Sequence, residues 1–132
     1  MRVVLADDDA GMCEALRSLL AEHLDIKVVG DAADGQAAIE RARELEPAIV
    51  VMDVVMPGMG GIEATRRVRE ALPRVRVIGL SLHEDRHFVA AMRAAGASGF
   101  VRKDRIHEEL AQALRAVAAG GTWWSTGAES PG

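Results

Sequence analysis

The sequence predicts an α/β protein with one doubly wound parallel sheet of five strands and five helices. Short runs rich in valine and isoleucine alternate with longer stretches in which apolar residues recur every three or four positions. Hydrophobic residues make up 49% of the chain but aromatic residues only 3%, so the core is expected to be aliphatic. Both features are typical of repeated strand–helix units around a buried sheet.

The strands are predicted from the short apolar runs. The first and third runs, VVL and AIVVM, are almost continuously apolar, as expected of central strands that helices cover on both faces. Turn-forming or polar residues separate each run from the helix that follows it. We place the five strands at residues 2–6, 26–30, 48–52, 75–80 and 98–101.

The helices are predicted from the apolar period between the strands. The first helix brings Cys13 close to its apolar face, and we interpret this single cysteine as a small buried hydrophobe. The last helix is the clearest, and Gly120 and Gly121 are expected to end it. Its apolar stripe consists of Ile106, Leu110, Ala113, Leu114 and Val117.

The chain of 132 residues has room for one domain of ordinary size, which we place at residues 1–119. Residues 120–132, GGTWWSTGAESPG, contain turn formers and small polar residues without a helical or strand period. We interpret them as a C-terminal tail or the start of an interdomain linker. The Trp123–Trp124 pair is expected to pack back on the last helix or to belong to that linker, and a docking patch is the alternative.

The composition excludes several partners. A net charge of −4 and a pI near 5.5 provide no basic field for a phosphate backbone, so no direct DNA binding by this chain is expected. No apolar run approaches the roughly 20 residues that span a bilayer, so no membrane partner is expected. No signal sequence is apparent, and we expect a cytoplasmic location.

Acidic residues follow two of the most apolar strands. Asp7, Asp8 and Asp9 come directly after the first strand, where their like charges repel unless a cation or a helix N-terminus offsets them. One of them can cap the first helix, and capping alone is the alternative to a metal site. Asp53 ends the third strand. Carboxylates at neighbouring strand ends can converge, and such hard oxygen ligands suit Mg²⁺.

Two further polar residues lie at the ends of later strands. Ser81 ends the fourth strand and Lys103 follows the fifth, so both should reach the same crevice as Asp53. A lysine ammonium can pair with phosphoryl oxygens, and a serine hydroxyl can donate a hydrogen bond to one. A carboxylate beside a metal ion can attack a phosphoryl group. The set therefore predicts aspartyl-phosphate chemistry.

The motifs LADDD, VVMDVVMPGMGGIEATRRVR, VIGLSLHED and AGASGFVRKD resemble those of response-regulator receiver domains, in particular the NarL/FixJ (LuxR-type) transcriptional regulators. The resemblance covers residues 2–119. It implies a flavodoxin-like sheet of strand order 2-1-3-4-5 and Mg²⁺-dependent phosphorylation by a sensor histidine kinase. Such a domain is not an enzyme, beyond self-phosphorylation from small phosphodonors and autodephosphorylation.

The resemblance also implies a role for each matching residue. Asp53 is the phosphoacceptor, and Ser81 and Lys103 are the hydroxyl and the lysine that contact the phosphoryl group. Phe100 matches the aromatic switch position that swings inward with Ser81 on phosphorylation. The implied metal ligands are Asp7, Asp8, Asp53 and the backbone carbonyl of Val55.

Asp104, Leu82 and His83 lie near the predicted site. Asp104 stands where many receivers have proline, and Leu82 is larger than the usual small residue after the hydroxyl position, where it is expected to restrict access. His83 is expected beside the site, where it helps to set the hydrolysis rate. A metal site made by His83 and His87 is disfavoured because no third ligand is evident.

The sequence disfavours two other functions. A phosphohydrolase of the haloacid-dehalogenase type would carry an acid at position 55, where this chain has valine. A nucleotide-binding module would carry a glycine-rich phosphate loop after the first strand. Within the receiver interpretation, the chain is either a stand-alone receiver or the N-terminal part of a regulator whose DNA-binding domain lies elsewhere. We favour the second, with homodimer formation on phosphorylation.

Overall fold

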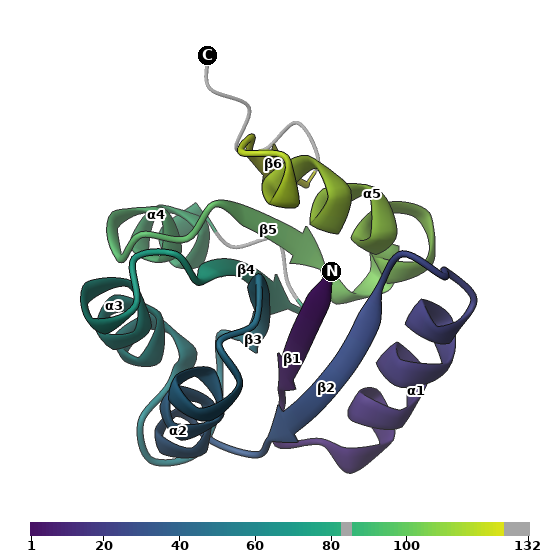
Figure 1. The fold of residues 1–132 in the computed structure, drawn as a ribbon. Coiled ribbons are helices and arrows are strands. Elements are labelled where there is room, and N and C mark those ends of the chain that lie inside the picture. Colours follow the sequence, from purple (N-terminus) through teal and green to yellow (C-terminus); the bar gives the residue numbers. More distant parts are fainter. Residues whose placement is uncertain (83–85, 126–132) are drawn as a thin grey trace.

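The computed structural model describes residues 1–82 and 86–125, which form a parallel sheet between two layers of helices (Figure 1). The sheet has the order β2-β1-β3-β4-β5-β6, which confirms the predicted order of the first five strands and adds a sixth. The strands are β1 (Arg2–Ala6), β2 (Lys27–Ala32), β3 (Ile49–Asp53), β4 (Arg76–Ser81), β5 (Gly99–Arg102) and β6 (Trp123–Trp124).

Five α-helices occur in the described residues, as predicted. Helices α1 and α5 cover one face of the sheet, and α2, α3 and α4 cover the other (Figure 1). None of them is long and apolar enough to span a membrane. The helices are α1 (Ala10–Ala21), α2 (Gly35–Leu45), α3 (Gly61–Ala71), α4 (Arg86–Ala94) and α5 (Ile106–Ala118), with a 3₁₀ turn, η1 (Lys103–Arg105), before α5.

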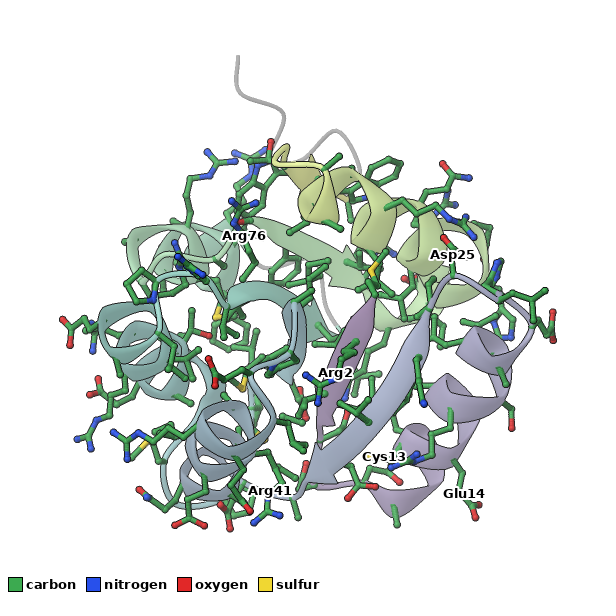
Figure 2. All side chains as sticks on the ribbon, viewed as in Figure 1. Arg2, Cys13, Glu14, Asp25, Arg41 and Arg76 are labelled. Carbon is green, nitrogen blue, oxygen red and sulfur yellow. The ribbon has the colours of Figure 1, made fainter. Side chains whose placement is uncertain are left out.

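The two faces of the sheet bury separate aliphatic clusters, because successive side chains of a strand point to opposite faces. Val50 and Met52 of β3 pack toward α2, α3 and α4, whereas Ile49 and Val51 pack toward α1 and α5. All four side chains are fully buried. Figure 2 shows polar atoms mainly at the periphery, where Glu14 projects outward from α1.

Cys13 is buried on α1, as expected of a small hydrophobe. Its thiol lies 3.6 Å from the backbone oxygen of Asp7. Burial raises the pKa of the Cys13 thiol, and the nearby Asp7 carboxylate raises it further. The thiol is therefore protonated at neutral pH and packs as an apolar group.

Four of the five predicted strands begin and end one or two residues later than the sequence indicated. The backbone ladder extends one residue past the ranges predicted for the third and fourth strands, since Asp53 pairs with Leu80 and Ser81 pairs with Arg102. Asp53 and Ser81 are therefore the last residues of β3 and β4. Rigid strands rather than loops hold both side chains.

The sixth strand is a difference from the predicted fold. Trp123 and Trp124 pair in parallel with Gly99 and Phe100 of β5, although the segment shows no strand period. The chain reverses after α5 at Gly120, whose positive φ of 97° favours glycine. Part of the segment interpreted as a linker therefore extends the sheet.

Glu109 of α5 anchors this sixth strand. It accepts hydrogen bonds from Trp123 Nε1 (2.9 Å), Ser125 Oγ (2.8 Å) and Arg105 Nε (2.9 Å). Burial alone would raise the pKa of Glu109, but these hydrogen bonds outweigh it and lower the pKa. The folded state therefore stabilises the ionised form of Glu109 more than the unfolded state does.

We expect Glu109→Gln to lower the melting temperature at neutral pH but not in acid. Because the folded pKa is depressed, the stabilisation by ionised Glu109 is fully present above the ordinary glutamate pKa. It is lost as pH falls through the folded pKa, where protonated glutamate resembles glutamine. Thermal melts of both proteins across acidic pH measure this. A difference that stays constant down to the lowest folding pH would contradict the prediction.

Candidate functional site

The functional site is built at the carboxyl ends of the parallel strands, where β1, β3, β4 and β5 meet. A pocket of about 480 Å³ opens there. Strand ends of this kind border the crevice in which open α/β sheets bind ligands. The pocket is lined by Asp7, Asp8, Asp9, Asp53, Val55, Ser81, Leu82, Phe88 and Lys103.

Three of the acids come close enough together to share one metal ion. Asp7, Asp8 and Asp53 each offer a carboxylate oxygen, and these oxygens lie within 4.8 Å of one another. Asp7 and Asp53 are buried, whereas Asp8 is exposed. Two buried acids and one exposed acid around an open pocket fit a hard dication that keeps some of its waters.

Asp9 has a different task from its two neighbours. Its Oδ1 accepts hydrogen bonds from the backbone N–H groups of Gly11 (2.9 Å) and Met12 (3.2 Å), so it caps the N-terminus of α1. The N–H of Asp9 in turn donates to Asp7 Oδ1 at 2.9 Å, which orients that carboxylate. Within the acidic run, Asp9 therefore caps the helix, whereas Asp7 and Asp8 offer carboxylate oxygens to the cluster with Asp53.

Lys103 lies between two of the acids. Its Nζ is 2.8 Å from Asp7 Oδ2 and 3.4 Å from Asp53 Oδ2, with only 8% of its side chain exposed. Burial tends to lower the pKa of Lys103, but the bond to Asp7 and the charges of both acids outweigh it and raise the pKa. The ammonium is therefore charged at neutral pH and held in the pocket.

Asp53 is ionised at neutral pH despite its surroundings. Burial raises the pKa of Asp53 to about 6, with Asp7 adding to the effect and Lys103 opposing it. The backbone N–H of Val55 donates to its Oδ1 at 3.3 Å. One carboxylate oxygen thus faces a backbone donor and the other faces the lysine ammonium, an arrangement that fixes the direction in which the group can react.

The remaining predicted residues border this centre. Ser81 is 4% exposed and lines the pocket from the end of β4. Val55 is 63% exposed and lines the pocket after the end of β3. Leu82 is 65% exposed at the pocket rim. Asp104 lies in η1 and accepts hydrogen bonds from Arg102. His83 lies outside the described residues.

Phe100, the predicted aromatic switch position, lies in the core. It is 1% exposed, and it packs over Gly79, where an added Cβ would lie 3.2 Å from its ring and 2.8 Å from Met92. The resemblance identifies Phe100 as the switch position, but it does not predict the conformation of its side chain. Any movement of Phe100 from this state is a rearrangement within the core.

Two contributors to the site were not singled out in the sequence. Phe88 of α4 lines the pocket, and its place in a short apolar stripe gave no sign of that role. Gly61 begins α3 against the backbone of Asp53: an added Cβ would lie 2.0 Å from the Asp53 carbonyl oxygen. The glycine run after Pro57 was the available signal.

Comparison with known proteins defines the class. Residues 3–115 match the family described as the response regulator receiver domain, and the chain belongs to that family. It is 38% identical over 120 residues to the response regulator GacA of Pseudomonas viridiflava, covering 91% of this chain and 56% of that protein. Receiver domains of this family are signalling domains that sensor kinases phosphorylate.

Within the family, the relatives are transcriptional regulators of the LuxR, or NarL/FixJ, type. The transcriptional regulatory protein MctR of Rhizobium johnstonii is 35% identical over 127 residues, covering 96% of this chain and 59% of that protein. A LuxR-family response regulator from Aurantimonas sp. SI85-9A1 superposes with a TM-score of 0.88 at 39% identity, covering 92% and 87% of the two chains. The chain spans a little over half the length of these curated relatives.

Proposed function

We propose that Asp53 is the phosphoacceptor of this receiver and that Mg²⁺, held by Asp7, Asp8, Asp53 and the Val55 carbonyl, assists the transfer. The observation that carries the proposal is the meeting of three carboxylates and one buried ammonium in a single pocket. Mg²⁺ bound there would neutralise charge on the phosphoryl oxygens. Cytoplasmic location is part of this proposal.

The transfer follows from the positions of the side chains. An oxygen of ionised Asp53 attacks the phosphorus of a kinase phosphohistidine, the new O–P bond forms, and the P–N bond breaks with its electron pair staying on the imidazole. The Lys103 ammonium, 3.4 Å from Asp53, pairs with the transferred phosphoryl oxygens, and Ser81 donates a hydrogen bond to one of them. Small donors such as acetyl phosphate supply the same group.

The test of this function is covalent phosphorylation in solution. We expect the chain to gain the mass of one phosphoryl group from acetyl phosphate or a phosphorylated sensor kinase when Mg²⁺ is present. Addition of a chelator should prevent the gain. Intact-protein and peptide mass spectrometry measure it, and failure of every donor in the presence of Mg²⁺ would refute the proposal.

Asp8→Asn is expected to weaken Mg²⁺ binding at least about tenfold, since it removes an anionic oxygen ligand while keeping the shape of the side chain. Asp9→Asn is the matched control, because asparagine retains the cap on α1. NMR shifts of the site backbone during a Mg²⁺ titration give both affinities. Equal affinities for the two variants would remove Asp8 from the ligand set.

We further propose that these residues do not bind DNA directly and that transcriptional output belongs to a domain outside them. The net charge is −4, and the exposed Arg66 and Arg67 of α3 are paired with Glu63. All helices of residues 1–82 and 86–125 pack on the sheet. Salt-sensitive, sequence-dependent mobility shifts of promoter DNA would contradict this. A stand-alone receiver acting by protein contact remains the alternative.

A further inference from the structure

Residues 123–125, here called the strap, cover the outer edge of β5 and join it to both neighbouring helices. The Trp123 N–H donates to the Ser98 carbonyl at 3.1 Å, and the Ser125 N–H donates to the Phe100 carbonyl at 2.8 Å. The approach is close: a Cβ at Gly99 would lie 2.8 Å from the Trp123 carbonyl oxygen. The strap therefore satisfies backbone groups that an edge strand would otherwise expose.

The two tryptophans of the strap face opposite sides of the sheet. Trp124 packs against the cluster that contains Phe100, and the guanidinium of Arg93 on α4 lies 4.2 Å from its ring centroid. Trp123 packs against the cluster under α5 and donates its indole N–H to Glu109. The strap thus spans α4, β5 and α5 at the edge of the sheet.

The same strand carries the strap on one side and the site lysine at its end. β5 has four residues, and Lys103 follows it directly. Phe100, at the centre of this short strand, is in register with Trp124 and accepts the strap's hydrogen bond from Ser125. If Lys103 moves toward the pocket, β5 should move with it. Because β5 contacts the strap directly, this movement would change the strap's position without any other element in between.

We propose that the strap is a releasable cover: it is docked in the unphosphorylated domain, and phosphorylation of Asp53 releases it from β5. The step rests on the proposed function, in which the phosphoryl group pairs with Lys103, the residue that directly follows β5. A shift of β5 toward the pocket would move the Phe100 carbonyl away from the Ser125 N–H and break the register of Phe100 with Trp124. Release uncovers the β5 edge and passes the signal to the chain that follows the strap.

Tryptophan fluorescence measures this release, because Trp123 and Trp124 are the only tryptophans in the sequence. Beryllofluoride with Mg²⁺, a mimic of the bound phosphoryl group, should shift the emission to the red and increase quenching by acrylamide. The Asp53→Asn protein should show neither change. NMR shifts in the Asp53 loop report separately whether beryllofluoride has bound.

Ser125→Pro and Ser125→Ala form a matched pair of variants. Both lose the hydroxyl that bonds Glu109, but only proline removes the N–H that bonds Phe100. Ser125→Pro should therefore show red-shifted emission without beryllofluoride. Because docking and phosphorylation are coupled reciprocally, it should also bind beryllofluoride about fivefold more tightly, whereas Ser125→Ala stays closer to the unmodified protein. Gly99→Ala, which crowds Trp123, should repeat the proline result.

The outcomes separate this proposal from the proposed function. Beryllofluoride binding with unchanged emission would overturn the strap and leave the phosphoacceptor assignment intact. A red-shifted emission of Ser125→Pro together with an unchanged affinity for beryllofluoride would show that strap docking and phosphorylation are independent. That result would also overturn the strap proposal. Absence of beryllofluoride binding in the unmodified chain would refute the proposed function and the coupling with it.

Discussion

Asp53→Asn is expected to abolish the gain of phosphoryl mass from acetyl phosphate or a phosphorylated kinase. Asparagine has the size of aspartate and keeps an oxygen that can accept the hydrogen bond from Val55, but its amide is not a nucleophile toward phosphorus. The loss should therefore be complete while the fold remains. Mass spectrometry of the intact protein measures the first result, and thermal unfolding measures the second.

The control for this variant is Asp34→Asn. Asp34 caps α2 by accepting a hydrogen bond from the N–H of Ala37 at 2.8 Å, and asparagine caps equally well. Asp34→Asn should be phosphorylated at the rate of the unmodified chain. Phosphorylation of Asp53→Asn at that same rate would move the acceptor to another residue.

Gly61→Ala is expected to destabilise the domain by about 3 kcal/mol or more. The added Cβ would lie 2.0 Å from the carbonyl oxygen of Asp53 and 2.9 Å from Cα of Val54. Both are backbone atoms, so no side-chain rotation relieves the overlap, and α3 must separate from the end of β3. The hydrogen bond from the N–H of Gly61 to the Val54 carbonyl would be lost with it. Urea denaturation measures the change in free energy of unfolding.

Gly60→Ala provides the comparison at the neighbouring position. Gly60 has φ of −76°, which any residue adopts, and an added Cβ would lie 3.5 Å from the Val54 carbonyl oxygen, an ordinary contact. Its cost should be about 1 kcal/mol or less, as for other substitutions at a helix N-cap. Similar losses for the two variants would mean that the close approach at Gly61 does not limit stability.

Much of the site could be predicted from the sequence because parallel strands bring their carboxyl ends to one edge. That rule was sufficient to bring together Asp53, Lys103 and the acids after β1. It could not decide which acid of the DDD run caps α1, since all three have the same chemistry. Only the backbone direction at Asp9 makes that distinction.

The parts that could not be predicted depend on tertiary contacts. The Trp123–Trp124 strand has no period of its own, and it forms because Gly99 permits a close approach and Glu109 accepts its donors. The burial of Phe100 similarly depends on the space over Gly79. A local sequence pattern does not show which distant residues a segment will contact, or how much space its side chains will have.

The lysine between Asp7 and Asp53 also sets the charge balance of the pocket. The three carboxylates of the Asp7, Asp8 and Asp53 cluster and the one ammonium have a net formal charge of −2 within a few ångströms. A divalent ion makes this ensemble electrically neutral, whereas a monovalent ion leaves it anionic and a trivalent ion makes it cationic. The valence of the ion that suits the pocket is therefore determined by a residue that is not among its ligands.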